Sequence, residues 1–183
     1  MFSKTSLLAL LPAFAAAAPA CGAPQPPPQP GSPSCGSTHP KWTLSPIDLS
    51  SYYTYTSPSA SGPKLGTISF TFANDQVDYV AECSGSSVNP QGIFYGFETF
   101  ECATEGGEEW KKTSFSYDTA SGVIAVNSTW MCPGGDVVYT TSGSGKPDLE
   151  CETSVWNNPD WEAGELYSNT TMVCEPGELV IQL

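Results

Sequence analysis

The stretch TSFSYDTASGVIAVNSTWMC, residues 113–132, decides the fold class. Thr113, Phe115 and Tyr117 alternate with polar residues, and a run rich in β-branched residues follows Gly122. Alternation on both sides of an Asp…Gly turn is typical of a β-hairpin, and glycine readily takes the positive φ that such a turn often needs. Side chains on a strand point to opposite faces in turn, so Phe115 and Tyr117 should share one face. We therefore predict a hairpin at the centre of an antiparallel β domain.

Short alternating runs separated by turn residues continue on both sides of this hairpin, and no segment has a sustained helical period. The pattern predicts one all-β domain over residues 41–183, an antiparallel β-sandwich or β-barrel of about ten strands. A second hairpin is expected around Ser144-Gly145. The other expected strands are 41–49, 66–74, 75–83, 92–102, 136–143, 146–155, 164–174 and 177–183, with loops at 51–64, 103–111 and 156–168.

The N-terminal segment has two parts of different composition. Residues 1–20 contain Lys4, an apolar middle and a run of small residues, which is typical of a secretory signal peptide. The apolar run is too short to span a membrane. Residues 21–40 are dominated by Pro, Gly and Ser, so we expect a disordered, Pro-rich arm that buries no core. The predicted location is extracellular.

The charge of the chain excludes some partners. The sequence has 6 Lys and no Arg against 19 Asp and Glu, for a formal net charge of −13. Such a chain is repelled by phosphate backbones and by anionic lipid headgroups, so we expect neither nucleic acid nor a membrane as a partner. Cationic partners are compatible with it.

Seven cysteines are disulfide candidates in an oxidising compartment. Cys83 and Cys102 end successive predicted strands, so we expect them to pair. Cys132 is expected to pair with Cys151 across the second hairpin, with Cys174 as a competing partner. Each bond should stabilise the fold by about 2–4 kcal/mol. The odd number leaves one thiol free or paired between chains. The alternatives for Cys21 and Cys35 in the arm are a bond to each other, a bond that ties the arm to the domain, or a bridge between two protomers.

Several of these features together resemble a known family. They are Trp42-x-Leu44, the order of the cysteines, the motif Phe115-Ser116-Tyr117-Asp118 and the following Ser121-Gly122-Val123-Ile124. Over residues 42–182 the chain resembles the small secreted fungal proteins typified by the Alternaria major allergen. Two features depart from that pattern, namely the additional late cysteine Cys174 and the Pro-rich arm.

The resemblance implies a secreted β-sandwich or β-barrel without an established catalytic site. It also implies an allergen-like or effector-like role, in which the protein binds a host extracellular protein or a small phenolic ligand. Some members dimerise through an additional N-terminal cysteine, so a disulfide-linked homodimer is expected through Cys21 or Cys35.

Catalytic and metal sites find little support in the sequence. The single histidine, His39, lies in the Pro-rich arm, where no packed scaffold would hold it for a catalytic triad, and one histidine cannot form a multi-histidine metal site. The cluster Asp148, Glu150 and Glu152 matches no calcium-loop spacing. We therefore predict no catalytic, cofactor or metal site. A two-carboxylate glycosidase remains a weaker hypothesis, with the pairs Glu98 and Glu101, Glu108 and Glu109, or Glu150 and Glu152.

Aromatic residues and sequons supply the remaining candidate sites. Aromatic side chains in loops can stack on sugar rings, so the alternative function is a carbohydrate-binding or cell-wall-associated module. The sequons at Asn127 and Asn169 predict N-glycosylation, and both asparagines should face solvent, which places Trp130 inside. The candidate stacking aromatics are Tyr52, Tyr53, Tyr55, Trp110, Trp156 and Trp161.

Overall fold

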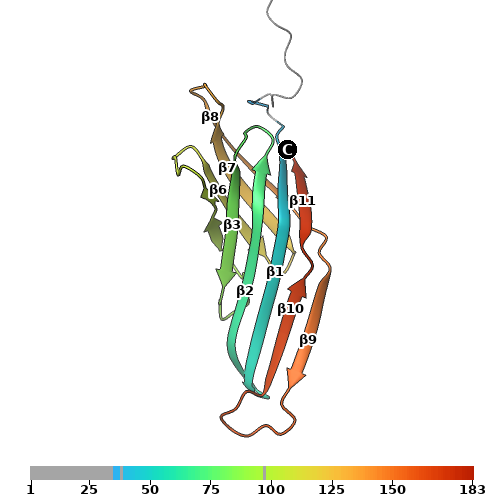
Figure 1. Ribbon diagram of the computed structural model, residues 1–183. Helices are drawn as coiled ribbons and strands as arrows, with labels where there is room; N and C mark the ends of the chain where they lie inside the picture. Colours follow the sequence, from blue (N-terminus) through green and yellow to red (C-terminus); the bar gives the residue numbers. More distant parts are fainter. Residues whose placement is uncertain (1–34, 38, 97) are drawn as a thin grey trace, which may run out of the picture. The chain divides into compact units, whose positions relative to one another are not determined.

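Two antiparallel β-sheets pack face to face within the unit Pro33–Leu183 (Figure 1). The structure is a computed structural model that describes residues 35–37, 39–96 and 98–183, so the predicted signal peptide and most of the arm lie outside the described residues. The described residues hold no helix long and apolar enough to cross a membrane. The strands are β1 (Lys41–Ser57), β2 (Ala60–Asn74), β3 (Val80–Ser87), β4 (Thr99–Glu101), β5 (Ala103–Thr104), β6 (Lys112–Asp118), β7 (Val123–Met131), β8 (Val138–Gly145), β9 (Cys151–Asn157), β10 (Ser168–Cys174) and β11 (Gly177–Gln182).

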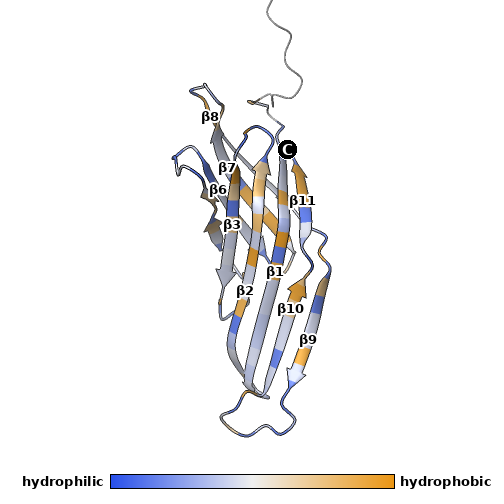
Figure 2. Ribbon diagram, in the orientation of Figure 1, coloured by the Kyte–Doolittle hydropathy of each residue, from blue (hydrophilic) through white to orange (hydrophobic). Residues whose placement is uncertain are grey.

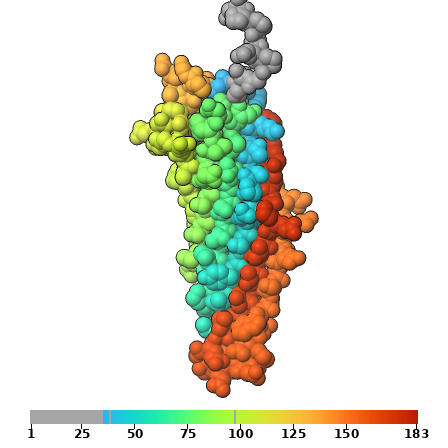
Figure 3. All heavy atoms as spheres, viewed as in Figure 1, coloured from blue at the N-terminus to red at the C-terminus, as the bar shows by residue number. Residues whose placement is uncertain are grey.

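The first sheet has the strand order β5-β3-β2-β1-β10-β9, and β11 also pairs with β1. The second sheet has the order β4-β6-β7-β8. The two sheets form a sandwich, and no closed barrel is found among the described residues, so the sandwich alternative of the prediction holds. Figure 3 shows β2, β1, β10 and β9 side by side on one surface of the unit.

The central hairpin is confirmed as β6 and β7. Its turn is held by Asp118, whose carboxylate accepts hydrogen bonds from the Ala120 and Ser121 amides and from the Ser121 hydroxyl at 2.6 Å. These hydrogen bonds lower the pKa of Asp118, and the bond from the Ser121 hydroxyl has the largest effect. Gly122 takes a φ of 70°, which a residue with a Cβ rarely adopts.

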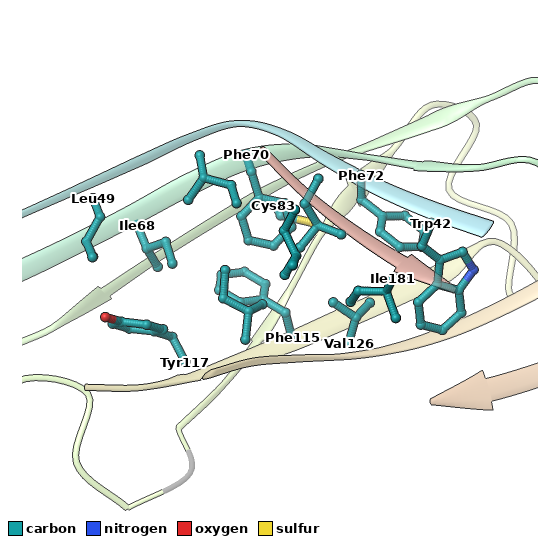
Figure 4. Packing of buried hydrophobic residues seen from close by; sticks show 14 of the residues in the cluster. Trp42, Leu49, Ile68, Phe70, Phe72, Cys83, Phe115, Tyr117, Val126 and Ile181 are labelled. Atoms are coloured by element: carbon teal, nitrogen blue, oxygen red, sulfur yellow. The ribbon is translucent and has the colours of Figure 1, made fainter. Parts of the chain in front are cut away.

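Hydrophobic and more polar residues alternate along β2, as the colours in Figure 2 show, and buried positions alternate along β2 and β6. The rings of Phe70 on β2 and Phe115 on β6 meet edge to face, with centroids 4.8 Å apart, and Figure 4 shows this contact in the core. Trp42 packs on Phe72 in the same way at 5.3 Å. Trp130 is 2 % exposed while Asn127 on the same strand is exposed, which agrees with the predicted orientation of β7.

The predicted second hairpin around Ser144-Gly145 is wrong. Strand β8 pairs with β7 in the second sheet, whereas β9 pairs with β10 in the first. Gly145, which suggested a turn, is instead a point of close packing between β8 and β11, as is Gly143. A Cβ on Gly145 would lie 2.9 Å from Leu179 Cδ1, and one on Gly143 would lie 3.1 Å from the Trp42 ring.

Other strand predictions need smaller corrections. Residues 51–64 are not a loop, because β1 runs to Ser57 and β2 begins at Ala60. Residues 92–102 are not one strand: Phe94 has a positive φ of 55°, and only β4 is extended. A buried anchor explains this turn, since Phe94 packs against Tyr117 with ring centroids 5.4 Å apart.

Three disulfides lie within the described residues. The expected Cys83–Cys102 bond is present. The predicted Cys132–Cys151 pairing is wrong, because Cys132 follows β7 of the second sheet whereas Cys151 begins β9 of the first. Cys151 instead bonds Cys174, which lies directly opposite it in the ladder. The bonded pairs are Cys35–Cys132, Cys83–Cys102 and Cys151–Cys174.

Replacing Phe115 by Ala should lower the free energy of unfolding by about 3–5 kcal/mol, because removing a buried ring leaves a cavity between the sheets. The next residue, Ser116, lies on the opposite face of β6, so Ser116→Ala should change stability by about 0.5 kcal/mol or less. Urea unfolding followed by tryptophan fluorescence measures both variants. Equal losses for the two would contradict the core position of Phe115.

Candidate functional site

Strand β9 is an open edge of the first sheet. It pairs with β10 on one side and with no strand on the other among the described residues. All seven of its residues are exposed, including Val155 at 60 % and Trp156 at 51 %. An edge strand carries unpaired N–H and C=O groups that can bind another extended chain. β9 has no proline and only one charged residue, Glu152, so it has few of the features that usually block such pairing.

The register of β1, β10 and β9 assigns side chains to the two faces of this region. Ser168 and Cys174 on β10 are buried, so the even-numbered residues of β10 face inward. Val155 lies opposite Thr170 and therefore faces inward, while Trp156 lies opposite Asn169 and faces outward. The two large apolar side chains of β9 thus flank its free edge on opposite faces.

The inward face of this region is only partly covered: Tyr53 and Met172 pack on the core, whereas Val155 is exposed. Residues 51–57 of β1 and 60–65 of β2 contain no buried side chain, and neither does β9. In Figure 1 these segments continue past the ends of β6, β7 and β8. We call β9, β10 and residues 51–57 and 60–65 the sheet extension.

The charge near the sheet extension is mainly negative, although Lys64 on β2 lies within the extension. Residues 147–183 contain eight Asp or Glu and no Lys or Arg. Three of these acids, Asp160, Glu162 and Glu165, lie in the segment that joins β9 to β10, and all three are exposed. A partner that docks on β9 would meet a negative potential, which favours a basic segment.

The six predicted stacking aromatics do not form one platform. Tyr53 lies on the face opposite Tyr52 and packs on the core, and the Trp161 ring meets Tyr167 edge to face at 5.7 Å. Tyr52 and Trp156 share the outward face of the sheet extension. The exposed members are Tyr52, Tyr55 and Trp156, and the half-buried ones are Tyr53, Trp110 and Trp161.

Trp110 is engaged by a lysine that the sequence did not single out. Lys111 Nζ lies 4.9 Å from the Trp110 ring and 5.0 Å from the Tyr79 ring, and it forms an ion pair with Glu108 at 2.8 Å. Burial, followed by the charges of Glu108 and Asp78, raises the pKa of Tyr79 to about 12. The cluster ties the loop before β6 to the start of β3.

The remaining catalytic candidates are not brought together. Glu98 is half-buried, whereas the other five members of the predicted pairs are exposed, so no pair has two shielded carboxylates. His39 Nδ1 lies 3.0 Å from the carbonyl oxygen of Leu183, away from any catalytic partner. In the parts of the chain that the structure describes, no three His, Cys, Asp or Glu side chains could hold a metal, which includes Asp148, Glu150 and Glu152.

The cavities are shallow or very small. The apolar cavity between Leu49, Tyr53, Phe94, Tyr117 and Met172 has a volume of about 20 Å³, which is room for little more than one water molecule. Burial, with a smaller contribution from Asp118, raises the pKa of Tyr117 at its wall. This cavity cannot enclose a phenolic ligand without rearrangement.

Replacing Tyr79 by Phe should leave stability at pH 7 unchanged or slightly higher, because the buried Tyr79 hydroxyl has no hydrogen-bond partner and the ring still faces Lys111. The raised pKa means that the folded state keeps the proton that the unfolded state loses near pH 10. The contribution of the Tyr79 hydroxyl to the free energy of unfolding is fully present below pH 10 and is lost as the pH rises toward 12. Urea unfolding across this range should show a shallower decline for Tyr79→Phe, and an unchanged decline would contradict the burial of the hydroxyl.

Comparison with known protein families gives a match. A family model described as Alternaria alternata allergen 1 matches residues 49–174, which is more than half of the chain. The comparison with curated proteins finds no match, and neither does the comparison with solved structures. The matched range begins in β1, ends with Cys174 and includes both strands of the central hairpin. The chain therefore belongs to the Alternaria alternata allergen 1 family.

Proposed function

We propose that this protein is a secreted, non-catalytic, effector-like protein that binds an extended basic segment of a host extracellular protein along β9. One observation carries the proposal: β9 is a seven-residue edge strand with every residue exposed. Adding a strand to such an edge satisfies the free backbone groups, and side chains such as Val155 then supply selectivity. The surrounding acids favour lysine or arginine in the partner.

Family membership supports the absence of catalysis in this proposal. The family is an allergen family with no known catalytic role. The disulfide bonds of this chain are consistent with a secreted protein. A small ligand is less well supported than a protein partner, because the cavity beside Tyr117 is too small to enclose one. A flat polysaccharide-binding platform is also less well supported, since the candidate aromatics lie on different faces.

Strand β8, the corresponding edge of the second sheet, provides a matched control. It is also exposed at every second residue, with Val138 at 52 %. Its remaining residues are half-buried, and Gly143 and Gly145 lie against β11. A partner strand would therefore find a more accessible edge at β9.

Binding can be measured with two peptides of the length of β9, one alternating Lys with Val and one alternating Glu with Val. The Lys peptide should bind and weaken as salt rises, and the Glu peptide should not bind. Val155→Lys should weaken binding by about tenfold, or about 1.4 kcal/mol, whereas Val138→Lys on β8 should not change it. Equal effects of the two substitutions, or retention on cellulose or chitin alone, would contradict the proposal.

The disulfides also bear on dimer formation. Cys35 is bonded to Cys132, and the other four cysteines of the described residues are bonded to one another, so Cys21 is the cysteine left over. We infer that a disulfide-linked homodimer would form through Cys21.

Non-reducing electrophoresis of the secreted protein should then show a dimer that mild reduction converts to a monomer. Cys21→Ser should give only monomer. Cys35→Ser should keep the Cys21 dimer, although it frees Cys132 as a second reactive thiol. A dimer that persists in Cys21→Ser would contradict this assignment.

A further inference from the structure

The sequon at Asn169 lies beside an exposed indole on the neighbouring strand. Asn169 on β10 is directly opposite Trp156 on β9 and Thr54 on β1. Side chains of directly opposite residues lie on the same face, with Cβ atoms about 4.5–5.5 Å apart. Trp156 and Asn169 are therefore immediate neighbours on the outward face of the sheet extension.

In this sequon the threonine side chain contacts the side-chain amide of the asparagine. The Thr171 hydroxyl donates a hydrogen bond to Asn169 Oδ1 at 3.3 Å. Thr171 lies two residues along the same strand, so both groups are on the outward face. The amide nitrogen of Asn169 makes no hydrogen bond within the described residues, which leaves it available for a substituent.

Trp156 is exposed without a protein partner for its ring. It is 51 % exposed, and among the described residues no aromatic ring or lysine packs on it. The indole face and the C–H face of a pyranose are both apolar, so stacking them removes apolar surface from water.

The second sequon lacks this neighbour. Asn127 on β7 lies opposite Ser114 on β6 and Ser142 on β8. These serines line a shallow depression whose aromatic lining residue, Phe115, is buried and so offers no exposed ring to stack on. Asn127 therefore lacks the adjacent exposed indole that Asn169 has, which makes it an internal control for stacking.

We propose that Asn169 carries an N-linked glycan and that its first N-acetylglucosamine stacks on Trp156. In the transfer, the Asn169 side-chain nitrogen forms a bond to the anomeric carbon of a lipid-linked oligosaccharide pyrophosphate. The bond from that carbon to the pyrophosphate oxygen breaks, the lipid pyrophosphate leaves and the amide loses one proton. Transfer takes place on the nascent chain, and stacking follows once β9 and β10 pair.

The stacked sugar would cover the outward face of β9 and leave the other face free. Val155 points to the opposite face. A sugar on the outward face also leaves the backbone N–H and C=O groups of the free edge unoccupied. The glycan would therefore restrict approach from one side. This inference does not rest on the proposed peptide binding, and it assigns the exposure of Trp156 to the chain's own sugar.

The test uses the full chain secreted from a eukaryotic host and trimmed with endoglycosidase H, which leaves one N-acetylglucosamine on each occupied asparagine. Mass spectrometry should find this sugar on Asn169. Asn169→Gln should lower Tm by about 2–4 °C in the presence of Trp156 and by less than about 1 °C in Trp156→Ala. Asn127→Gln should have the same effect with and without Trp156.

A second readout avoids substitution of the tryptophan. Releasing the whole glycan from the untrimmed wild-type protein with peptide N-glycosidase F, which hydrolyses the asparagine side-chain amide to Asp, should increase quenching of tryptophan fluorescence by acrylamide relative to the trimmed protein, because the indole of Trp156 becomes accessible. The same treatment of Asn169→Gln should not increase it. An unmodified Asn169, equal Tm losses with and without Trp156, or unchanged quenching would overturn the proposal.

Discussion

The edge-to-face contact between Phe70 and Phe115, 4.8 Å between ring centroids, is the interaction on which the two-layer structure depends. It joins a strand from each sheet in the core, where the apolar face of the central hairpin meets β2. Where the second sheet ends, no equivalent contact is present among the described residues. In the sheet extension the Cys151–Cys174 bond instead joins β9 to β10. A covalent link there replaces part of the stability that a second layer would supply.

This division between covered and uncovered sheet is the basis of the proposed binding site. The covered part offers only shallow depressions and one very small cavity, and no pair of shielded carboxylates lies in it. The uncovered part offers a free backbone edge, two exposed apolar side chains and a negative surround. Such a surface is suited to holding another chain rather than to transforming a substrate.

The sequence predicted those features that depend on neighbouring residues. Alternation around Asp118 and Gly122 was sufficient for the hairpin, and Cys83 and Cys102 could be paired because they end adjacent strands. Prediction from the sequence failed where one residue type can have two structural roles. Gly145 resembles a turn glycine, but it is small because Leu179 approaches it, and this misreading also led to the wrong partner for Cys132.

The candidate site could be predicted only in part. Trp156 was named as an exposed aromatic, but its position opposite Asn169 depends on the register across a long connection, which no local pattern encodes. The exposure of the β9 side chains likewise depends on which residues the second sheet does not cover. Lys111 gave no signal at all, because its contacts with Tyr79 and Trp110 join a loop to a distant strand.

Hydrogen exchange of the β9 amides in the secreted protein tests the open edge most directly. Because β9 pairs on one side only, amides that point toward β10 should exchange slowly and the alternate ones should exchange almost as in an unstructured chain. The amides of β6 and β7, two adjacent strands within the second sheet, give the protected reference. Uniform protection along β9 would show that the edge is covered, and uniform rapid exchange would show that the strand is not formed. Either result would contradict the account.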